Sequence, residues 1–194
     1  MVRLIESWGS DEQVANIASL SYGHEKAKDS ERLLERLIKN NHMSVFEFAG
    51  VTFYVETSII VQRQWMRHRH LSYLEQSLRY VKTPDLEFMI NNDRFNSEDM
   101  SLLATNSFKA SIEIYNMLLD NGVSAEVARS VLPLGFKTKF YTSGNLRSWL
   151  QFLQLRLAND AQEEIRTEAK QVLELLRERF PITMSIFESH LAHK

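Results

Sequence analysis

The chain has 194 residues, of which 44% are hydrophobic and 25% are charged, and its formal net charge is −2. This composition excludes an intrinsically disordered chain, and the length favours one compact domain that spans residues 1–194. Because the sequence shows no apolar run of about 20 residues and no basic N-terminal region ahead of an apolar block, we expect a cytoplasmic protein without a membrane span or signal peptide.

The first half of the chain mixes helical and extended patterns. Residues 11–41 repeat apolar side chains at helical spacing, and residues 59–68 are also predicted to form a helix. Between them, residues 51–58 alternate apolar and polar side chains, which predicts a strand. Residues 81–107 combine weak periodicity with Pro and Asn, so we expect a surface excursion there, with one short strand near residues 86–90.

The second half is predicted to be mainly helical. Helical spacing covers residues 108–119 and 125–132, and a proline and a glycine then separate it from a predicted strand at residues 137–141. Residues 145–179 contain no Pro or Gly and are predicted to form one long helix or two abutting helices, ended by Pro181. Strands and long helices without regular βαβ alternation favour an α+β fold, with an antiparallel sheet flanked by long helices.

Positive charge is concentrated in residues 63–82, which carry a net charge of +4 while the rest of the chain sums to −6. A cationic island on an acidic chain favours a local anion over an extended polyanion. On a helix, Gln64, Arg67 and His68 share one face, and guanidinium groups suit phosphates because they donate two parallel hydrogen bonds. We therefore predict a phosphorylated small-molecule ligand; a solvated helix face is the alternative.

The same segment also has features of a single-stranded nucleic-acid binder. Trp65, Tyr73 and Tyr80 alternate with the arginines, and aromatic side chains between cations form stacking platforms for bases. The acidic charge of the whole chain and the lack of a wider basic stripe argue against this alternative. We therefore expect no specific nucleic-acid partner.

Neither a metal site nor a thiol nucleophile is expected. His68 and His70 alternate with Arg67 and Arg69, and adjacent cations repel a metal ion. The sequence contains no cysteine, which excludes disulfides, thiolate metal ligands and a cysteine nucleophile.

Arg156 lies in an apolar stretch, FLQLRLA at residues 152–158. A charge in such surroundings needs a partner, which favours a ligand contact over a solvated surface arginine. On the same predicted helix, Arg147 and Gln151 are four residues apart, and Asn145 shares a face with Arg156 at a distance of about 16 Å along the axis.

The sequence RHRHLSYLEQSLRY at residues 67–80 resembles the signature of the flavin-dependent thymidylate synthases. That signature is R-H-R-x-x-S-x-N-E-x-S-x-R-Y, where x is any residue. HMSVFE at residues 42–47 resembles the upstream block H-x-[ST]-P-F-E of that family. Segments between residues 128 and 166 resemble its C-terminal half, so the similarity covers essentially residues 15–181. The chain departs from the family pattern at Leu74, where Asn is expected, at Val45, where Pro is usual, and at Phe48, where His is usual.

The resemblance implies the reductive methylation of dUMP to dTMP. Methylenetetrahydrofolate supplies the carbon, and NADPH reduces a bound FAD that delivers hydride. The other kind of thymidylate synthase attacks the uracil ring with a cysteine, so the cysteine-free sequence agrees with the flavin-dependent enzymes. The family also implies a homotetramer with sites shared between subunits, since a 194-residue chain has little room to enclose three ligands alone. A flavoprotein of other chemistry and a nucleotide-binding oligomer without activity are the alternatives.

Site residues carry over to this sequence from the matching family motifs. The contacts implied for FAD are Ser21, His42, Ser44, Arg67, His68, Arg69, Glu75, Asn145, Arg147 and Gln151. The contacts implied for dUMP are Gln64, Arg67, Glu75, Gln76, Ser77, Arg79, Arg129 and Arg156. Arg156 is the implied catalytic residue: its charge stabilises negative charge at a ring nitrogen of uracil and so activates the opposite ring carbon.

Overall fold

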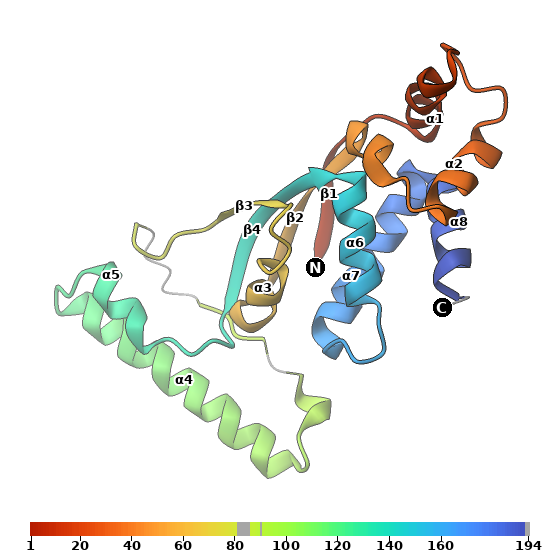
Figure 1. Ribbon diagram of the computed structural model, residues 1–194. Coiled ribbons are helices and arrows are strands. Elements are labelled where there is room, and N and C mark those ends of the chain that lie inside the picture. The colour runs from red at the N-terminus through yellow and green to blue at the C-terminus, as the bar shows by residue number, and fades with distance from the viewer. Residues whose placement is uncertain (81–85, 90, 193–194) are drawn as a thin grey trace. The chain divides into compact units, whose positions relative to one another are not determined.

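The computed structural model describes residues 1–80, 86–89 and 91–192. Its four-stranded sheet has the order β1-β2-β4-β3 (Figure 1), formed by β1 (Val2–Trp8), β2 (Gly50–Ser58), β4 (Lys137–Asn145) and β3 (Ser72–Glu75). β1 pairs antiparallel with β2, and Leu4 lies opposite Phe53. The predicted α+β fold with an antiparallel sheet is confirmed.

The helices account for most of the remaining described chain. The α-helices are α1 (Asp11–Ser19), α2 (Ser30–Lys39), α3 (Ile59–Trp65), α4 (Glu98–Asp120), α5 (Ala125–Ala128), α6 (Leu146–Arg156), α7 (Glu163–Arg179) and α8 (Pro181–Ala192). The short 3₁₀ helices are η1 (Leu20–Tyr22), η2 (Met43–Phe48), η3 (Asn92–Arg94) and η4 (Arg129–Val131). Among the described residues, we find no helix with the length and hydropathy needed to cross a membrane.

Two of the predicted N-terminal helices have different boundaries in the structure. The helical stretch predicted at residues 11–41 consists of two α-helices, α1 and α2, because Gly23 adopts a left-handed φ of 75° after η1 and Asp29 then caps the start of α2. The helix predicted at residues 59–68 ends at Trp65. The strand predicted at residues 51–58 is confirmed as β2.

Further boundaries change in the second half. α4 begins ten residues before the predicted start, because Ser97 caps it and accepts a hydrogen bond from the Met100 backbone N–H. Residues 86–89 form an isolated bridge, Phe88 to Phe136, instead of a strand, while residues 81–85 and 90 of the predicted excursion lie outside the described residues. The helix predicted at residues 125–132 is α5 followed by η4.

The C-terminal predictions are partly confirmed. The strand predicted at residues 137–141 is β4, which extends to Asn145. Of the two possibilities for residues 145–179, the structure has two helices, α6 and α7. The predicted end of this helical stretch at Pro181 is confirmed, because α7 ends at Arg179, and a further helix, α8, begins at Pro181.

The chain divides into two compact units. The first contains Met1–Val55, Trp65–Tyr73 and Tyr141–Lys194. Its core includes an aromatic cluster in which Trp65 stacks on Phe152 with 4.3 Å between ring centroids, and Trp149 meets Phe53 edge-on at 4.9 Å. All four of these side chains are fully buried. This cluster packs residues of α6 against Trp65 at the end of α3 and against Phe53 of β2.

The second unit contains Glu56–Gln64 and Leu74–Phe140. In it, α4 contacts α5 and η4, and Tyr115 of α4 is fully buried. Phe108 of α4 stacks on Phe88 with 5.2 Å between ring centroids. A Cβ atom at Gly135 would lie 2.4 Å from the Phe108 ring, so this close approach requires glycine.

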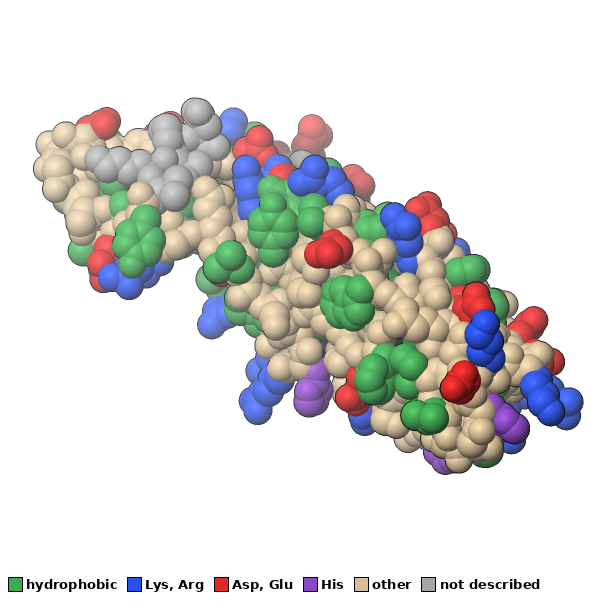
Figure 2. Space-filling view, turned by 90° about the horizontal axis from the view of Figure 1, so that it is seen from above, with side chains coloured by type: hydrophobic (Ala, Val, Ile, Leu, Met, Phe, Trp, Pro, Cys, Tyr) green, Lys and Arg blue, Asp and Glu red, His purple; other side chains and the backbone are tan. Residues whose placement is uncertain are grey.

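The face of the molecule in Figure 2 carries exposed hydrophobic side chains, many of them bordered by charged ones. Single exposed apolar side chains are usual on soluble proteins and need no partner. Only a contiguous and patterned set of them points to an interface.

Candidate active site

The arginine-rich segment after α3 is held by two turns and a buried tryptophan. The His68 N–H donates to the Trp65 carbonyl at 3.0 Å, and the Leu71 N–H donates to the His68 carbonyl at 3.1 Å. The buried Trp65 indole N–H donates to Glu168 of α7 at 2.6 Å. Because α3 ends at Trp65, the single helical face predicted for Gln64, Arg67 and His68 does not form.

A close backbone approach fixes the end of this segment. A Cβ atom at Gly144 of β4 would lie 2.3 Å from a terminal carbon of the buried Leu71 side chain. Glycine therefore leaves the space that Leu71 fills, and this contact positions residues 67–71 beside the end of β4.

A cavity of about 240 Å³ brings together much of the predicted site within the first unit. The residues that line it are Arg67, His68, Arg69, His70, Leu71, Ser148, Gln151, Leu155 and Arg156. Five of these residues were predicted from the sequence, namely Arg67, His68, Arg69, Gln151 and Arg156. The cavity therefore concentrates cationic and hydrogen-bonding groups from two segments, residues 67–71 and α6.

Arg156 and His68 form a direct hydrogen bond inside this cavity. The Arg156 Nε–H donates to His68 Nε2 at 2.9 Å. The His68 side chain is buried, with its ring 4.9 Å from Phe152 in an edge-on arrangement. Burial lowers the pKa of His68 to about 4, and the positive charge of Arg156 contributes to this lowering. His68 is therefore neutral at pH 7, with Nε2 as the acceptor and the proton on Nδ1.

Tyr73, which is not among the site residues predicted from the sequence, completes the surroundings of Arg156. Its hydroxyl donates to the Trp65 carbonyl, and burial raises the Tyr73 pKa above its usual range, so the phenol stays neutral. Burial also lowers the pKa of Arg156, an effect that Tyr73 opposes and Arg67 reinforces. An aromatic residue inside a strongly polar segment was the available signal for Tyr73.

Tyr73 and Trp65 also bear on nucleic-acid binding. Trp65 is fully buried, so it has no exposed face on which a base could stack. Tyr73 is half-buried and held by its hydroxyl, and only Tyr80 is strongly exposed, at 79%. The three aromatic residues do not form the stacking platform that the nucleic-acid alternative requires.

Two other predicted cofactor contacts in the first unit, Asn145 and Arg147, already have protein partners. Asn145 caps α6, because its side-chain oxygen accepts from the Ser148 N–H at 3.0 Å and from the Ser148 hydroxyl at 2.8 Å. Arg147 forms an ion pair with Glu47 of η2 at 2.6 Å. The exposed residues Ser21, His42 and Ser44 lie in or next to the 3₁₀ helices η1 and η2.

The remaining predicted residues belong to the second unit, where two of the arginines meet one acidic residue. The Arg79 guanidinium forms an ion pair with the Glu126 carboxylate at 3.2 Å. The Arg129 Nε–H donates to the backbone carbonyl of the same Glu126 at 3.3 Å. Arg79 therefore contacts the side chain of Glu126 and Arg129 contacts its backbone, although 50 positions separate the two arginines in the sequence.

Glu75, Gln76 and Ser77 lie close to Arg79 in the chain and differ in their contacts. The Glu75 carboxylate accepts from the Gln62 amide at 3.0 Å and from the Thr138 hydroxyl at 2.6 Å. The Ser77 hydroxyl accepts from the Arg79 backbone N–H at 3.3 Å. Gln64 lies in α3 and is half-buried.

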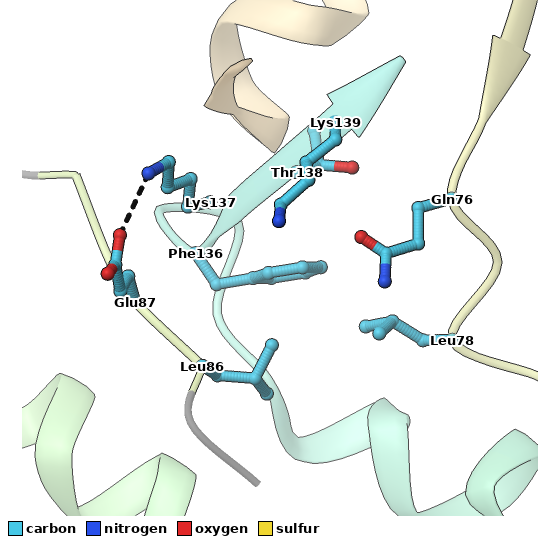
Figure 3. Close-up of a pocket in the computed structure, with 8 residues that line it drawn as sticks. All are labelled: Gln76, Leu78, Leu86, Glu87, Phe136, Lys137, Thr138 and Lys139. Atoms are coloured by element: carbon cyan, nitrogen blue, oxygen red, sulfur yellow. Dashed lines mark hydrogen bonds and ion pairs between the residues drawn. The ribbon is translucent and has the colours of Figure 1, made fainter. Parts of the chain in front are cut away.

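Gln76 extends into a separate small cavity of about 130 Å³ (Figure 3). Figure 3 shows Gln76 and Leu78 facing the Phe136 ring, while Lys137 turns away to an ion pair with Glu87 at 2.9 Å. Hydrogen bonds to Glu87 and Glu56 raise the pKa of Lys137, which therefore stays protonated. The small volume and the carboxylate-bound lysine make this cavity a poor anion site.

Comparison with known proteins identifies the family. Residues 3–182 match the family described as "Thymidylate synthase complementing protein". A flavin-dependent thymidylate synthase of Thermus thermophilus is 34% identical to this chain, and the match covers 98% of the chain and 76% of the relative. A flavin-dependent thymidylate synthase of Thermotoga neapolitana is 38% identical, and the match covers 96% of the chain and 89% of the relative. The chain belongs to the flavin-dependent thymidylate synthase family. The resemblance inferred from the motif at residues 67–80 is confirmed.

A solved structure agrees with this membership of the flavin-dependent thymidylate synthase family. A UMP/dUMP methylase of Streptomyces cacaoi, crystallised with 5-Br dUMP, matches the chain with a TM-score of 0.86 and 28% identity. The match covers 97% of this chain and 94% of that protein. Within the described residues, no group of three or more His, Asp or Glu side chains is arranged to hold a metal ion.

Proposed function

We propose that this chain is a flavin-dependent thymidylate synthase, which methylates the uracil ring of dUMP with carbon from methylenetetrahydrofolate. Family membership supports the reaction class, and the placement of Arg156 is the observation that carries the proposal. A half-buried guanidinium, held at Nε by a neutral histidine, lines a cavity with Arg67, Arg69 and Gln151. The sequence has no cysteine, so this chemistry has to proceed without a thiolate on the ring.

Arg156 is proposed to activate the uracil ring by electrostatics. Its positive charge stabilises negative charge at a ring nitrogen. Delocalisation of that negative charge through the ring then makes the opposite carbon nucleophilic toward the incoming methylene group. A cation that is already held in place stabilises the transition state without reorganising. His68 acts as a positioning residue, because it accepts from Nε and so fixes the plane of the guanidinium.

The cavity residues fit a flavin cofactor by their hydrogen-bonding chemistry. Arg67 and Arg69 suit pyrophosphate oxygens, whereas the Gln151 amide and the Ser148 hydroxyl suit the polar edge of a heteroaromatic ring. Leu71 and Leu155 offer apolar surface beside these groups. When bound, FAD reduced by NADPH supplies the hydride that converts the transferred methylene carbon into a methyl group.

Arg79 and Arg129 are proposed to hold the phosphate of dUMP. In the structure the carboxylate of Glu126 lies against Arg79 at 3.2 Å, so this guanidinium is already oriented toward an anion. The pair is exposed and therefore weak, so a doubly charged phosphate can displace the carboxylate. Ser77 assists through the turn that it forms with the Arg79 N–H.

The size of the main cavity supports sites that are shared between subunits of a homotetramer. Small-molecule and cofactor sites usually enclose about 300–1,000 Å³. The cavity around Arg156 encloses about 240 Å³, which is too little for a dinucleotide together with a nucleotide and a folate. A second copy is therefore proposed to supply the remaining walls.

UMP methylation is a second candidate activity. It is favoured by one observation, the match over 97% of the chain to a protein described as a UMP/dUMP methylase. The two substrates differ only in the 2′-hydroxyl of the sugar, so the same assay separates them.

The deciding experiment is tritium release from the methylated ring carbon of labelled dUMP or UMP. Methylation replaces the hydrogen on that carbon, so release that requires FAD, NADPH and methylenetetrahydrofolate together, with dTMP as product, supports the proposal. Release from UMP in preference to dUMP supports the second activity. Tritium retained by a protein that binds FAD and dUMP contradicts both and indicates a nucleotide-binding protein. NADPH oxidation that does not depend on dUMP indicates a flavoprotein of other chemistry.

A further inference from the structure

A large cavity lies beside α2 in the first unit. It encloses about 730 Å³, within the usual range of about 300–1,000 Å³ for small-molecule sites. Its walls are formed by residues between Tyr22 and Asp29, which connect η1 to α2, and by the side of α2 from Arg32 to Asn40. It shares no lining residue with the cavity around Arg156, so it is a separate candidate site.

The wall that precedes α2 is held in place by hydrogen bonds to α1. Asn16 Oδ1 accepts from the Ala27 N–H at 2.8 Å, and the Ser19 hydroxyl donates to the His24 carbonyl at 2.9 Å. The His24 N–H donates back to the Ser19 carbonyl at 3.2 Å. This segment is therefore preorganised, and a ligand that binds beside it does not have to order it first.

Cationic side chains come together at this cavity from both walls. Lys26 and Lys28 belong to the connecting segment, whereas Arg32, Arg36 and Lys39 belong to α2. The three cations of α2 are four and three residues apart, so they share one face of the helix and extend over about 10 Å of its axis. A cavity lined by charges of one sign attracts ligands of the opposite sign.

Part of this charge is already satisfied inside the protein. The Asp29 carboxylate caps α2 by accepting from a backbone N–H of that helix at 3.0 Å, and Glu35 forms an ion pair with Lys39 at 2.7 Å. Arg36 lies over the Tyr22 ring, with 4.9 Å between the guanidinium carbon and the ring centroid. Both carboxylates of the cavity walls thus have partners of their own.

The other cations of the cavity are left for a ligand. Among the described residues, no carboxylate lies within ion-pair distance of Lys26, Lys28 or Arg32. Arg32 has the planar fork that donates two parallel hydrogen bonds to a phosphate, and the lysines add compact charges for further phosphate oxygens. Cations on both walls fit a chain of phosphate groups better than a single phosphate.

Tyr22 gives the cavity an aromatic surface next to these cations. Its side chain is 54% exposed, although Arg36 lies over the ring. An exposed aromatic ring is a surface on which a base can stack, and an arginine beside it adds a cation–π contribution. The half-buried Leu33 adds apolar surface to the same cavity. A base on Tyr22 and phosphates on the cations together describe a nucleotide.

We propose that this cavity is a second nucleotide site, which binds a nucleoside polyphosphate with its base on Tyr22 and its phosphates on Lys26, Lys28 and Arg32. The ligand binds as the free anion and not as a magnesium complex. Both carboxylates of the walls have other partners, and the described residues include no group of three or more His, Asp or Glu arranged to hold a metal ion. The inference does not rest on the proposed reaction, because it uses no residue of the Arg156 cavity.

Titration with ATP tests the site and its separation from the Arg156 cavity. In EDTA and excess dUMP, ATP is expected to bind in isothermal titration calorimetry, and Arg32→Ala is expected to raise its Kd about tenfold. The matched control is Arg179→Ala, which removes an exposed arginine of α7 that does not line this cavity and is expected to leave the Kd unchanged.

Three outcomes of this titration overturn the proposal. Equal losses in Arg32→Ala and Arg179→Ala would show only a nonspecific attraction between ATP and positive charge. ATP that is displaced by dUMP would show that the two nucleotides share one site. A protein that does not bind ATP has no such site, whether or not it methylates dUMP.

Variants of Tyr22 and shortened ligands test the two parts of the nucleotide. Tyr22→Phe keeps the ring and is expected to preserve the Kd for ATP, whereas Tyr22→Leu removes the ring and is expected to raise it about tenfold. AMP and inorganic triphosphate are each expected to bind more weakly than ATP, and magnesium is expected to weaken ATP binding. Inorganic triphosphate that binds as tightly as ATP overturns the role of the base. AMP that binds as tightly, or magnesium that tightens binding, overturns the role of the free phosphate chain.

Discussion

Arg156 is a cation among apolar residues, and its proposed role depends on this placement. If Arg156 stabilises charge on the uracil ring as proposed, Arg156→Ala removes the stabilising guanidinium and kcat is expected to fall by about 10²–10³-fold. The FAD content of the purified protein, measured by flavin absorbance, is expected to change little. Arg156→Lys keeps the charge without the planar fork and serves as the matched variant with an intermediate kcat. If flavin content and kcat fall in parallel, Arg156 binds the cofactor and does not act on the substrate.

His68 makes the folded state sensitive to acid. Its pKa in the folded protein is about 4, below the usual 6.5, so between these values the unfolded chain binds a proton that the folded chain does not. Stability from His68 is therefore fully present above pH 6.5 and is lost as the pH falls toward 4, by up to about 3 kcal/mol.

The matched variant for this prediction is His68→Gln, whose amide oxygen also accepts a hydrogen bond from Arg156 but does not titrate. Urea unfolding at several pH values between 6.5 and 4.5 is expected to show a steeper loss of stability in the original protein than in this variant. Parallel curves for the two proteins would show that another group controls the acid sensitivity.

Glu126 competes with the proposed phosphate for Arg79. Replacing it by Gln removes the carboxylate but keeps the size of the side chain and its backbone contact with Arg129. Because an exposed ion pair contributes on the order of 1 kcal/mol or less, Glu126→Gln is expected to tighten dUMP binding by about two- to fivefold. Isothermal titration with dUMP measures this change, and weaker binding would show that Glu126 orients the arginine instead of blocking it.

At the scale of whole elements, helices and strands with a regular pattern of apolar side chains were predicted. Elements that depend on residues distant in the sequence were not. α2 and β2 follow the sequence pattern, because Leu34, Leu37 and Ile38 of α2 and alternate residues of β2 are buried. β1 was missed, since an irregularity between Leu4 and Glu6 breaks the alternation of its side chains. α8 was missed because the residue that caps it is Asp11, which lies 171 positions before Ile182.

The distant cap of α8 leads to a stability prediction. The buried Asp11 carboxylate accepts hydrogen bonds from the backbone N–H groups of Ile182 and Thr183 and from the Thr183 hydroxyl. Asp11→Ala leaves these donors without a partner and is expected to lower the free energy of unfolding by about 2–3 kcal/mol. The control is Asp29→Ala, which removes an exposed cap with one hydrogen bond and is expected to cost about 1 kcal/mol. Urea unfolding of both variants measures the difference, and equal losses would contradict the role assigned to Asp11.

At the scale of the whole molecule, the sequence motifs selected residues that line one cavity, whereas periodicity did not arrange them correctly. The motif at residues 67–80 included Arg67, His68 and Arg69, which the structure places in one cavity with Arg156. Helical spacing placed Gln64 on the same face, which is wrong because α3 ends before Arg67. The contact between His68 and Arg156 joins residues 88 positions apart, and local patterns carry no information at that separation.

Complementation between inactive variants tests whether the site is shared. If Arg156 of one subunit and Arg79 of another act on the same dUMP, Arg156→Ala and Arg79→Ala proteins are each inactive alone. Mixed under conditions that exchange subunits, they form some assemblies in which one site receives both native arginines, and activity returns to as much as about a quarter of the original per site. The tritium-release assay of the mixture against the two separate proteins measures this return. A mixture that stays as inactive as its components would show that each chain supplies both arginines to its own site.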